Sequence, residues 1–310
     1  MTQEYSHQPV LLKEALAGLS IQPGGVYVDG TFGRGGHAGA ILAMLGPEGK
    51  LLAMDKDPDA VRSATHQFGD DPRFEIEQGS FVMLGNMLEQ QHLQGQVNGL
   101  LLDLGVSSPQ LDDASRGFSF SEDGPLDMRM DPDTGRSAAD WLQSVEEKFL
   151  KQILFKYGEE RDAARIAKAI VIAREQSAIS TTLQLAEIVA SVVPAHTRKK
   201  HPATKTFQAI RIFINDELGQ IEAALQQSLD VLKRGGRLCV ISFHSLEDRL
   251  VKRFMRDASR ESEQYRGMPN VPEEFRPKMQ LIGKAVSATA AEISDNPRAR
   301  SARLRIAERL

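Results

Sequence analysis

The chain has 310 residues and a formal net charge of −4, with 41% hydrophobic and 26% charged residues. This composition is typical of a soluble globular protein of about two domains, and the weakly acidic net charge gives no support for a nucleic-acid partner. A single cysteine, Cys239, excludes an intramolecular disulfide, and the sequence carries neither a signal-peptide pattern nor an apolar run of ~18 residues. We therefore expect a cytoplasmic protein that does not enter a membrane.

The first motif is a glycine-rich turn between a short strand and a helix. Residues Val26 to Asp29 predict the strand, His37 to Leu45 predict the helix, and the turn contains Gly30, Gly33, Gly35 and Gly36. Glycine permits positive φ and close backbone approach, and a helix start presents free N–H groups, as a nucleotide-sized ligand requires. The alternative is an ordinary tight turn with no ligand.

Later strands end in acidic or polar residues. The strand after the turn ends in Asp55, about twenty residues past the last glycine, where a nucleotide-binding βαβ unit places the acid that contacts ribose. A third strand over 73–78 leads to Phe81, and a fourth over 97–104 leads into Asp103 to Gln110. Ligands of doubly wound sheets bind outside the carboxyl ends of the strands, so we expect Gly35, Gly36, His37, Asp55, Phe81, Asp103 and Gln110 to converge.

The pattern then changes from alternating strands and helices to helices alone. Residues 112–136 predict a long ordered loop, and helices are expected over about 137–157, over 160–176, and from Thr181 to just before Pro194. Since no strand is evident there, 113–203 are interpreted as an inserted all-helical domain, and 1–112 with 204–310 as the core. A fifth strand over 237–243 and two last strands, near 280–286 and 303–309, predict a terminal antiparallel hairpin on a mostly parallel sheet.

Two nucleotide cofactors fit the turn. Gly33 to Ala38 also satisfy the dinucleotide pattern G-x-G-x-x-A, which favours an NAD-dependent enzyme. Asp29 and Asp103, however, place negative charge where a pyrophosphate would lie, whereas S-adenosylmethionine lacks phosphate and carries a cationic sulfonium and ammonium. The polar turn Ser107 to Gln110 is similar to the Ser-Pro-Pro-aromatic signature of amino-methylating enzymes. These features favour S-adenosylmethionine.

The longest motifs together resemble a known family, the bacterial MraW methyltransferases of small-subunit ribosomal RNA. The resemblance covers essentially the whole chain and is carried by residues 29–37, 103–110, 116–120, 124–130, 201–218, 241–248 and 296–301. It implies a Rossmann-like class I methyltransferase core with a helical insert for substrate recognition. It also implies methylation of N4 of a cytosine in the decoding region (the P site) of 16S rRNA within the assembled small ribosomal subunit. By carry-over, Gly35, Gly36, His37, Asp55, Phe81, Asp103 and Gln110 would bind the S-adenosyl-L-methionine cofactor.

Several residues are candidates for the chemistry itself. Ser107 and Ser108 could hold the target amine, with turn capping as the alternative, and His244 could move a proton or serve only structure. Cys239, between Leu238 and Val240 within a strand, is expected to be an inert buried thiol, which argues against methylation at cytosine C5.

Contacts with RNA are expected from basic segments and aromatic residues. The basic segments are 198–200 with Lys205, 249–260 and 298–305, each of which taken alone is more often a solvated face. Phe118 and Phe120 are candidate stacking partners for a base. We predict no metal site, and nothing in the sequence indicates an oligomeric state. An amino-methyltransferase of other RNA or DNA, and a non-catalytic ribosome assembly factor, are the remaining alternatives.

Overall fold

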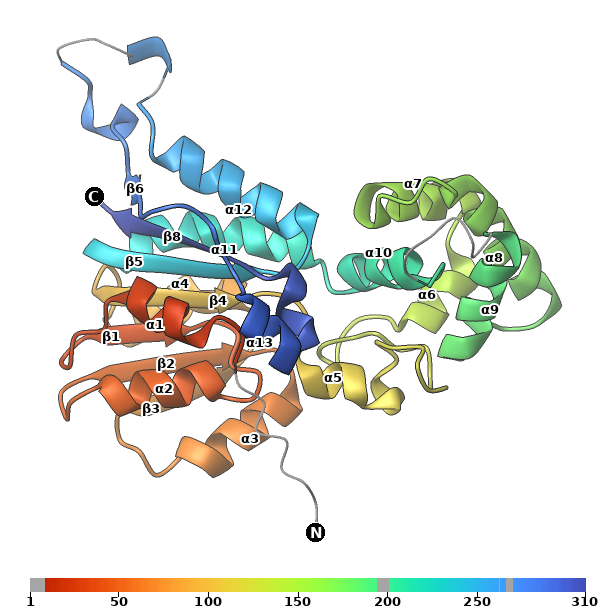
Figure 1. The fold of residues 1–310 in the computed structure, drawn as a ribbon, viewed down its shortest axis with the longest axis horizontal. Coiled ribbons are helices and arrows are strands. Elements are labelled where there is room, and N and C mark those ends of the chain that lie inside the picture. Colours follow the sequence, from red (N-terminus) through yellow and green to blue (C-terminus); the bar gives the residue numbers. More distant parts are fainter. Residues whose placement is uncertain (1–8, 194–200, 262, 266–269) are drawn as a thin grey trace. The chain divides into compact units, whose positions relative to one another are not determined.

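The computed structural model describes residues 9–193, 201–261, 263–265 and 270–310 (Figure 1). The chain divides into two compact units, one formed by Met1–Gly105 with Leu218–Leu310 and the other by Val106–Glu217. Each unit has hydrophobic core residues of its own, two clusters in the first and one in the second. Within the described residues, no helix is both long enough and apolar enough to cross a membrane.

The first unit is built on one eight-stranded sheet with the order β3-β2-β1-β4-β5-β8-β6, in which β7 also pairs with β8. Strands β1 to β5 are mutually parallel, whereas β6, β7 and β5 all pair with β8 antiparallel. This arrangement confirms the predicted doubly wound, mostly parallel sheet with an antiparallel end. The strands are β1 Val26–Asp29, β2 Lys50–Asp55, β3 Phe74–Gln78, β4 Val97–Asp103, β5 Leu232–Ser242, β6 Met279–Leu281, β7 Val286–Ser287 and β8 Arg303–Arg309.

Helices cover both faces of this sheet. One hydrophobic cluster packs α1, α2, α3 and the segment after α13 against one face, and the other packs α4, α11 and α12 against the opposite face. Strand β4 is buried on both sides, as its nearly continuous apolar sequence predicts. The helices are α1 Leu12–Leu19, α2 Gly36–Met44, α3 Pro58–Phe68, α4 Leu84–Gln90, α11 Glu217–Val231, α12 Ser245–Ala258 and α13 Ala290–Asp295, with 3-10 turns at Phe81–Met83, Glu263–Tyr265, Glu273–Phe275 and Pro297–Ser301.

The second unit is helical in the residues that are described. Helix α7 packs against α10 and α8, α8 packs against α9, and α10 also contacts α6. The long loop before α6 is ordered: Asn215 donates a hydrogen bond to the Met128 carbonyl and accepts one from the Met130 N–H, both at 2.8 Å. The helices are α5 Ser108–Asp112, α6 Ala138–Ser144, α7 Glu147–Gly158, α8 Ala163–Gln176, α9 Thr182–Val192 and α10 Thr204–Ile214, with a 3-10 turn at Ala114–Arg116.

The second unit is longer than the insert expected over 113–203. It begins at Val106 and ends at Glu217, so it also takes in α5 and α10. Helix α10 belongs there because its buried side chains, among them Phe207 and Ile210, lie in the same cluster as those of α7 and α8. The basic run over 198–200 lies outside the described residues.

Candidate cofactor site

Three aspartates lie at the carboxyl ends of neighbouring parallel strands. Asp29 ends β1, Asp55 ends β2 and Asp103 ends β4, and β1 pairs with both of the other strands. Immediately after β1 the Gly30 N–H continues the pairing with β4 by donating to the Leu101 carbonyl at 3.0 Å. The three strand-end acids therefore lie at one edge of the sheet within the first unit, and their contact with a cofactor stays a prediction.

Thr31 connects two of these acids. Its backbone N–H donates to Asp29 Oδ1 at 3.1 Å, and its side-chain oxygen accepts a hydrogen bond from the Asp103 N–H at 2.6 Å. Thr31 was not predicted from the sequence. A hydroxyl residue two positions after a strand-end aspartate, within a glycine-rich turn, signals only the local contact with that acid.

The side chains of Asp29 and Asp103 are only partly satisfied. Asp29 is 1% exposed, and among the described residues neither its Oδ2 nor Asp103 Oδ1 has a hydrogen-bond partner. Burial is the main cause that raises the pKa of Asp29 to about 7, and Asp55 raises it further by repulsion. Burial, with repulsion from Asp29 and Glu247, also holds the pKa of Asp103 well above its usual range. Such a pair would be stabilised by a cationic ligand.

Asp55 organises the glycine-rich turn. Its Oδ2 accepts a hydrogen bond from the Gly33 N–H at 2.8 Å, and its Oδ1 accepts one from the Asp57 N–H at 2.9 Å. Burial raises the pKa of Asp55, and these backbone hydrogen bonds oppose that shift. Asp55 therefore ties the end of β2 to the turn, and its oxygens retain lone pairs that a hydroxyl group could meet.

His37 lies beside the Asp103 carboxylate as a neutral side chain. Its Nδ1 is 3.8 Å from Asp103 Oδ2, and burial lowers the pKa of the imidazole to about 4, although a hydrogen bond with the Val10 backbone raises it. At neutral pH this contact is therefore not an ion pair, and His37 does not neutralise Asp103. Phe81 lies at the same edge, because a Cβ built on Gly30 would be 3.4 Å from its Cβ.

Gly35 and Gly36 are required by packing inside the protein. Gly35 has φ +76°, and a Cβ there would meet the Phe32 ring at 2.5 Å. A Cβ on Gly36 would lie 2.3 Å from Cγ of Pro9. Both positions therefore exclude side chains whether or not a ligand is bound, and a contact of these glycines with a cofactor stays a prediction.

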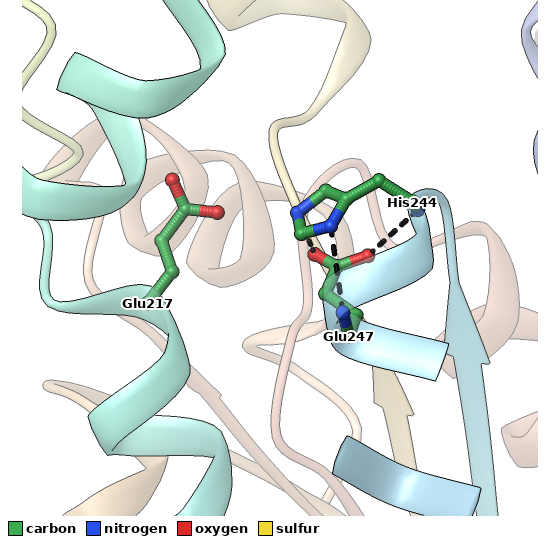
Figure 2. Close-up of side chains that lie close together, drawn as sticks. All are labelled: Glu217, His244 and Glu247. Atoms are coloured by element: carbon green, nitrogen blue, oxygen red, sulfur yellow. Dashed lines mark hydrogen bonds and ion pairs between the residues drawn. The ribbon is translucent and has the colours of Figure 1, made fainter. Parts of the chain in front are cut away.

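His244 and Glu247 face each other at the start of α12 (Figure 2). The Glu247 N–H donates to His244 Nδ1 at 3.4 Å, and Glu247 Oε2 accepts from the His244 N–H at 3.1 Å, which forms a capping box. His244 Nε2 lies 3.2 Å from Glu247 Oε1. Glu247 is fully buried and was not predicted from the sequence, although a glutamate three residues after an N-cap is the usual signal for this motif.

The remaining candidates, Ser107, Ser108 and Gln110, belong to the second unit. There the Ser107 N–H donates to the buried Gln110 side-chain oxygen at 2.9 Å, closing the capping box that begins α5, and Ser108 is half-buried. The predicted stacking residues differ from expectation. Phe118 is buried in the core of that unit, and the Phe120 ring packs on His201 and Phe207 with centroids 4.7 Å away in each case.

Comparisons with known proteins identify the family. A model of the MraW methylase family matches residues 4–310. The chain is also similar to solved structures of a proposed rRNA methylase from Clostridium thermocellum (12% identity, TM-score 0.45, covering 98% of this chain and 100% of that one). An rRNA methylase from Streptococcus thermophilus gives 10% identity and a TM-score of 0.44, with 98% of each chain covered. Fibrillarin from Aeropyrum pernix, solved with S-adenosyl-L-methionine, gives 11% identity and a TM-score of 0.41, with 96% of this chain and 73% of that chain covered.

The structural similarities have TM-scores below 0.5, so the assignment depends on the family match, which extends over nearly the whole length. That match excludes the alternative of an NAD-dependent enzyme. The chain belongs to the MraW methylase family and is a methyltransferase that uses S-adenosylmethionine.

Proposed function

We propose that this methyltransferase methylates N4 of a cytosine in the decoding region of 16S rRNA. It would act in the cytoplasm on the assembled small ribosomal subunit and so tune decoding fidelity. Family membership and the motifs at 103–110 and 124–130 support the proposal. The single observation that carries the cofactor part is the pair of carboxylates, Asp29 and Asp103, whose buried oxygens lack partners among the described residues.

The residues at the sheet edge fit S-adenosylmethionine. When bound, the cofactor supplies a methyl group on a cationic sulfonium, and it carries no phosphate. Asp29 and Asp103 would balance its positive charge, and Asp55 would accept hydrogen bonds from the ribose. Gly35, Gly36 and His37 would line the start of α2, and Phe81 would offer an apolar surface to the adenine.

The acceptor atom is proposed to be an exocyclic amine because the chain lacks the thiolate that methylation at cytosine C5 needs. Cys239 is the only cysteine, it is fully buried in β5, and burial raises the pKa of its thiol to about 12. A thiol that is neither exposed nor ionised is a poor nucleophile. Cytosine N4 requires no covalent enzyme intermediate.

The transfer itself is an in-line displacement in which positioning does most of the work. A bond forms between N4 and the methyl carbon, the bond from that carbon to sulfur breaks, and N4 then releases one proton. Ser107 and Ser108 are the proposed groups that hold the amine. His244 is a weaker candidate for the proton acceptor, because both of its ring nitrogens face Glu247.

We expect His244→Asn to retain methyl transfer within a few-fold of wild type. Asparagine is a good N-cap, so the variant should also keep its free energy of unfolding, whereas His244→Ala should lose about 1 kcal/mol. Single-turnover rates and thermal melts of both variants test this. A His244→Asn protein with normal stability but a rate reduced more than about a hundredfold, near the range of a lost general base, would instead give His244 a role in the chemistry.

The unit formed by Val106–Glu217 is proposed to recognise the RNA, together with the basic segments of the chain. The alternatives are methylation of DNA or another RNA, and an assembly factor that does not transfer methyl groups. An assay with labelled S-adenosylmethionine should separate them when small subunits from a strain lacking this protein, free 16S rRNA and DNA are offered side by side. Incorporation into subunits supports the proposal, and label in DNA alone, or in none of the three, contradicts it.

A further inference from the structure

One surface of the second unit combines a highly exposed aromatic ring with exposed lysine side chains. Phe155 on α7 is 67% exposed. Lys148, Lys151 and Gln152 on the same helix are also exposed. The spacing i, i+3, i+4 and i+7 places all four side chains on one stripe of the helix, with Lys151 and Gln152 directly next to Phe155. We call these four residues the Phe155 stripe.

The opposite side of α7 explains why the stripe faces outward. Leu150, Ile153 and Leu154 are buried in the core of the second unit, where α7 packs against α10 and α8. An aromatic residue left outside such a complete apolar face is not required for packing. The Phe155 ring is therefore available for a contact outside the core.

The lysines of the stripe are available to a ligand. In the part of the chain that the structure describes, neither Lys148 nor Lys151 makes an ion pair, although the exposed Glu147 lies one turn before Lys151 on α7. Two ammonium groups on the N-terminal side of an exposed ring, along one stripe of the helix, complement a chain that alternates flat bases with phosphates. Protein–protein interfaces, by contrast, are depleted in lysine.

We infer that the Phe155 stripe binds an unpaired segment of the RNA substrate, with a base stacked on Phe155 and phosphates near Lys148 and Lys151. This inference depends on the proposed RNA substrate and adds to it the place where the RNA is held. The segment must be single-stranded, because bases inside a duplex have no free face and a side chain cannot enter the narrow major groove of an RNA helix. Gln152 can donate to and accept from a base edge.

A second aromatic residue, Phe149, supports a rigid platform on the same helix. It is 41% exposed, and its ring packs edge-on against Phe213 at 5.5 Å, while Phe213 in turn packs on Trp141 at 4.6 Å. The helix is thus held from inside by a row of rings. A surface that does not rearrange loses little entropy when it binds.

The test uses the full chain and four variants. Phe155→Ala should weaken binding to a 12-nucleotide single-stranded RNA, and raise KM for small subunits, by about 5- to 100-fold, as loss of one stacked base does. Phe155→Trp should retain affinity. Leu183→Ala on α9, another exposed apolar residue but with Glu187 one turn away, is the matched control and should change nothing. In the double variant Lys148→Gln, Lys151→Gln, the slope of log affinity against log salt should fall by about 1.4.

The Phe155→Ala protein should keep the kcat, the melting temperature and the affinity for S-adenosylmethionine of wild type. The inference is overturned if Phe155→Ala binds RNA as Leu183→Ala does. It is also overturned if Phe155→Ala alters sedimentation of the protein but not RNA affinity, which would make the stripe a protein interface. If wild type binds RNA through Phe155 but methylates no subunit, the proposed function fails and the stripe stands as an RNA surface.

Discussion

The variant Asp103→Asn should bind S-adenosylmethionine at least about a hundredfold more weakly than wild type, because it deletes a carboxylate that would face a cationic ligand. The change preserves the shape of the side chain. Asp103 is 26% exposed, and its Oδ1 has no partner among the described residues, so no internal hydrogen bond is lost at that atom. Isothermal titration calorimetry measures the affinity, and Asp70→Asn, an exposed aspartate, is the control.

The same variant should be no less stable than wild type when no ligand is present. Repulsion from Asp29 and Glu247, together with burial, makes the charged form of Asp103 unfavourable in the folded protein, so a neutral amide relieves it. A purely structural aspartate behaves in the opposite way, since its removal lowers the melting temperature. Loss of binding together with retained or increased stability at pH 8 therefore identifies Asp103 as a ligand-binding acid. Lower stability with unchanged affinity contradicts that role.

Affinity for S-adenosylmethionine should rise with pH between about 5.5 and 7.5, by up to about tenfold per pH unit below the pKa of the acid involved. Asp29, with a pKa of about 7, must lose its proton before it can face a cation. Calorimetry in two buffers of different ionisation enthalpy should show proton release on binding at pH 6.5. Adenosine, which is neutral and lacks the methionine portion, should show no such dependence. Flat affinity across this range, or proton uptake, would contradict the role of Asp29.

The unliganded protein should show the opposite trend. The folded-state pKa of Asp29 is raised above 3.8, so its favourable contribution is complete below pH 3.8 and is lost as pH rises through about 7. This shift in the pKa of Asp29 corresponds to a loss of free energy of unfolding on the order of 4 kcal/mol. His37 has the opposite effect on stability. Burial lowers the pKa of its imidazole from 6.5 to about 4, so its contribution to the free energy of unfolding is lost as the pH falls from 6.5 toward 4. Chemical denaturation of wild type and Asp29→Asn, compared at each pH, isolates Asp29.

The sheet and the acids at its edge could be predicted because their signals are local. Strand β8 occupies the predicted 303–309, and Asp29, Asp55 and Asp103 end strands as the alternation of strands and helices indicates. Thr31 was missed because its importance lies in the Asp103 N–H, which is 72 positions away in the sequence. No local pattern reports such a hydrogen bond.

The helical unit shows where local patterns fail. A single helix over 137–157 was predicted, but the chain forms α6 and α7 with extended backbone at Val145 and Glu146. Arg174 on α8 stabilises the break by donating to the Leu142 and Val145 carbonyls at 2.5 and 2.7 Å. Phe118 was expected to face RNA and is in the core instead, because aromatic residues in a loop give no periodicity that distinguishes inside from outside.

The proposed methylation of cytosine N4 is tested most directly by mapping methylated nucleotides in small-subunit rRNA by tandem mass spectrometry, in strains with and without this protein. The account predicts one N4-methylated cytosine in the decoding region that is absent from the deletion strain, returns with the wild-type gene, returns with Cys239→Ser, and does not return with Asp103→Asn. Methylation at C5 that requires Cys239, or an rRNA methylation pattern unchanged by the deletion, would contradict it.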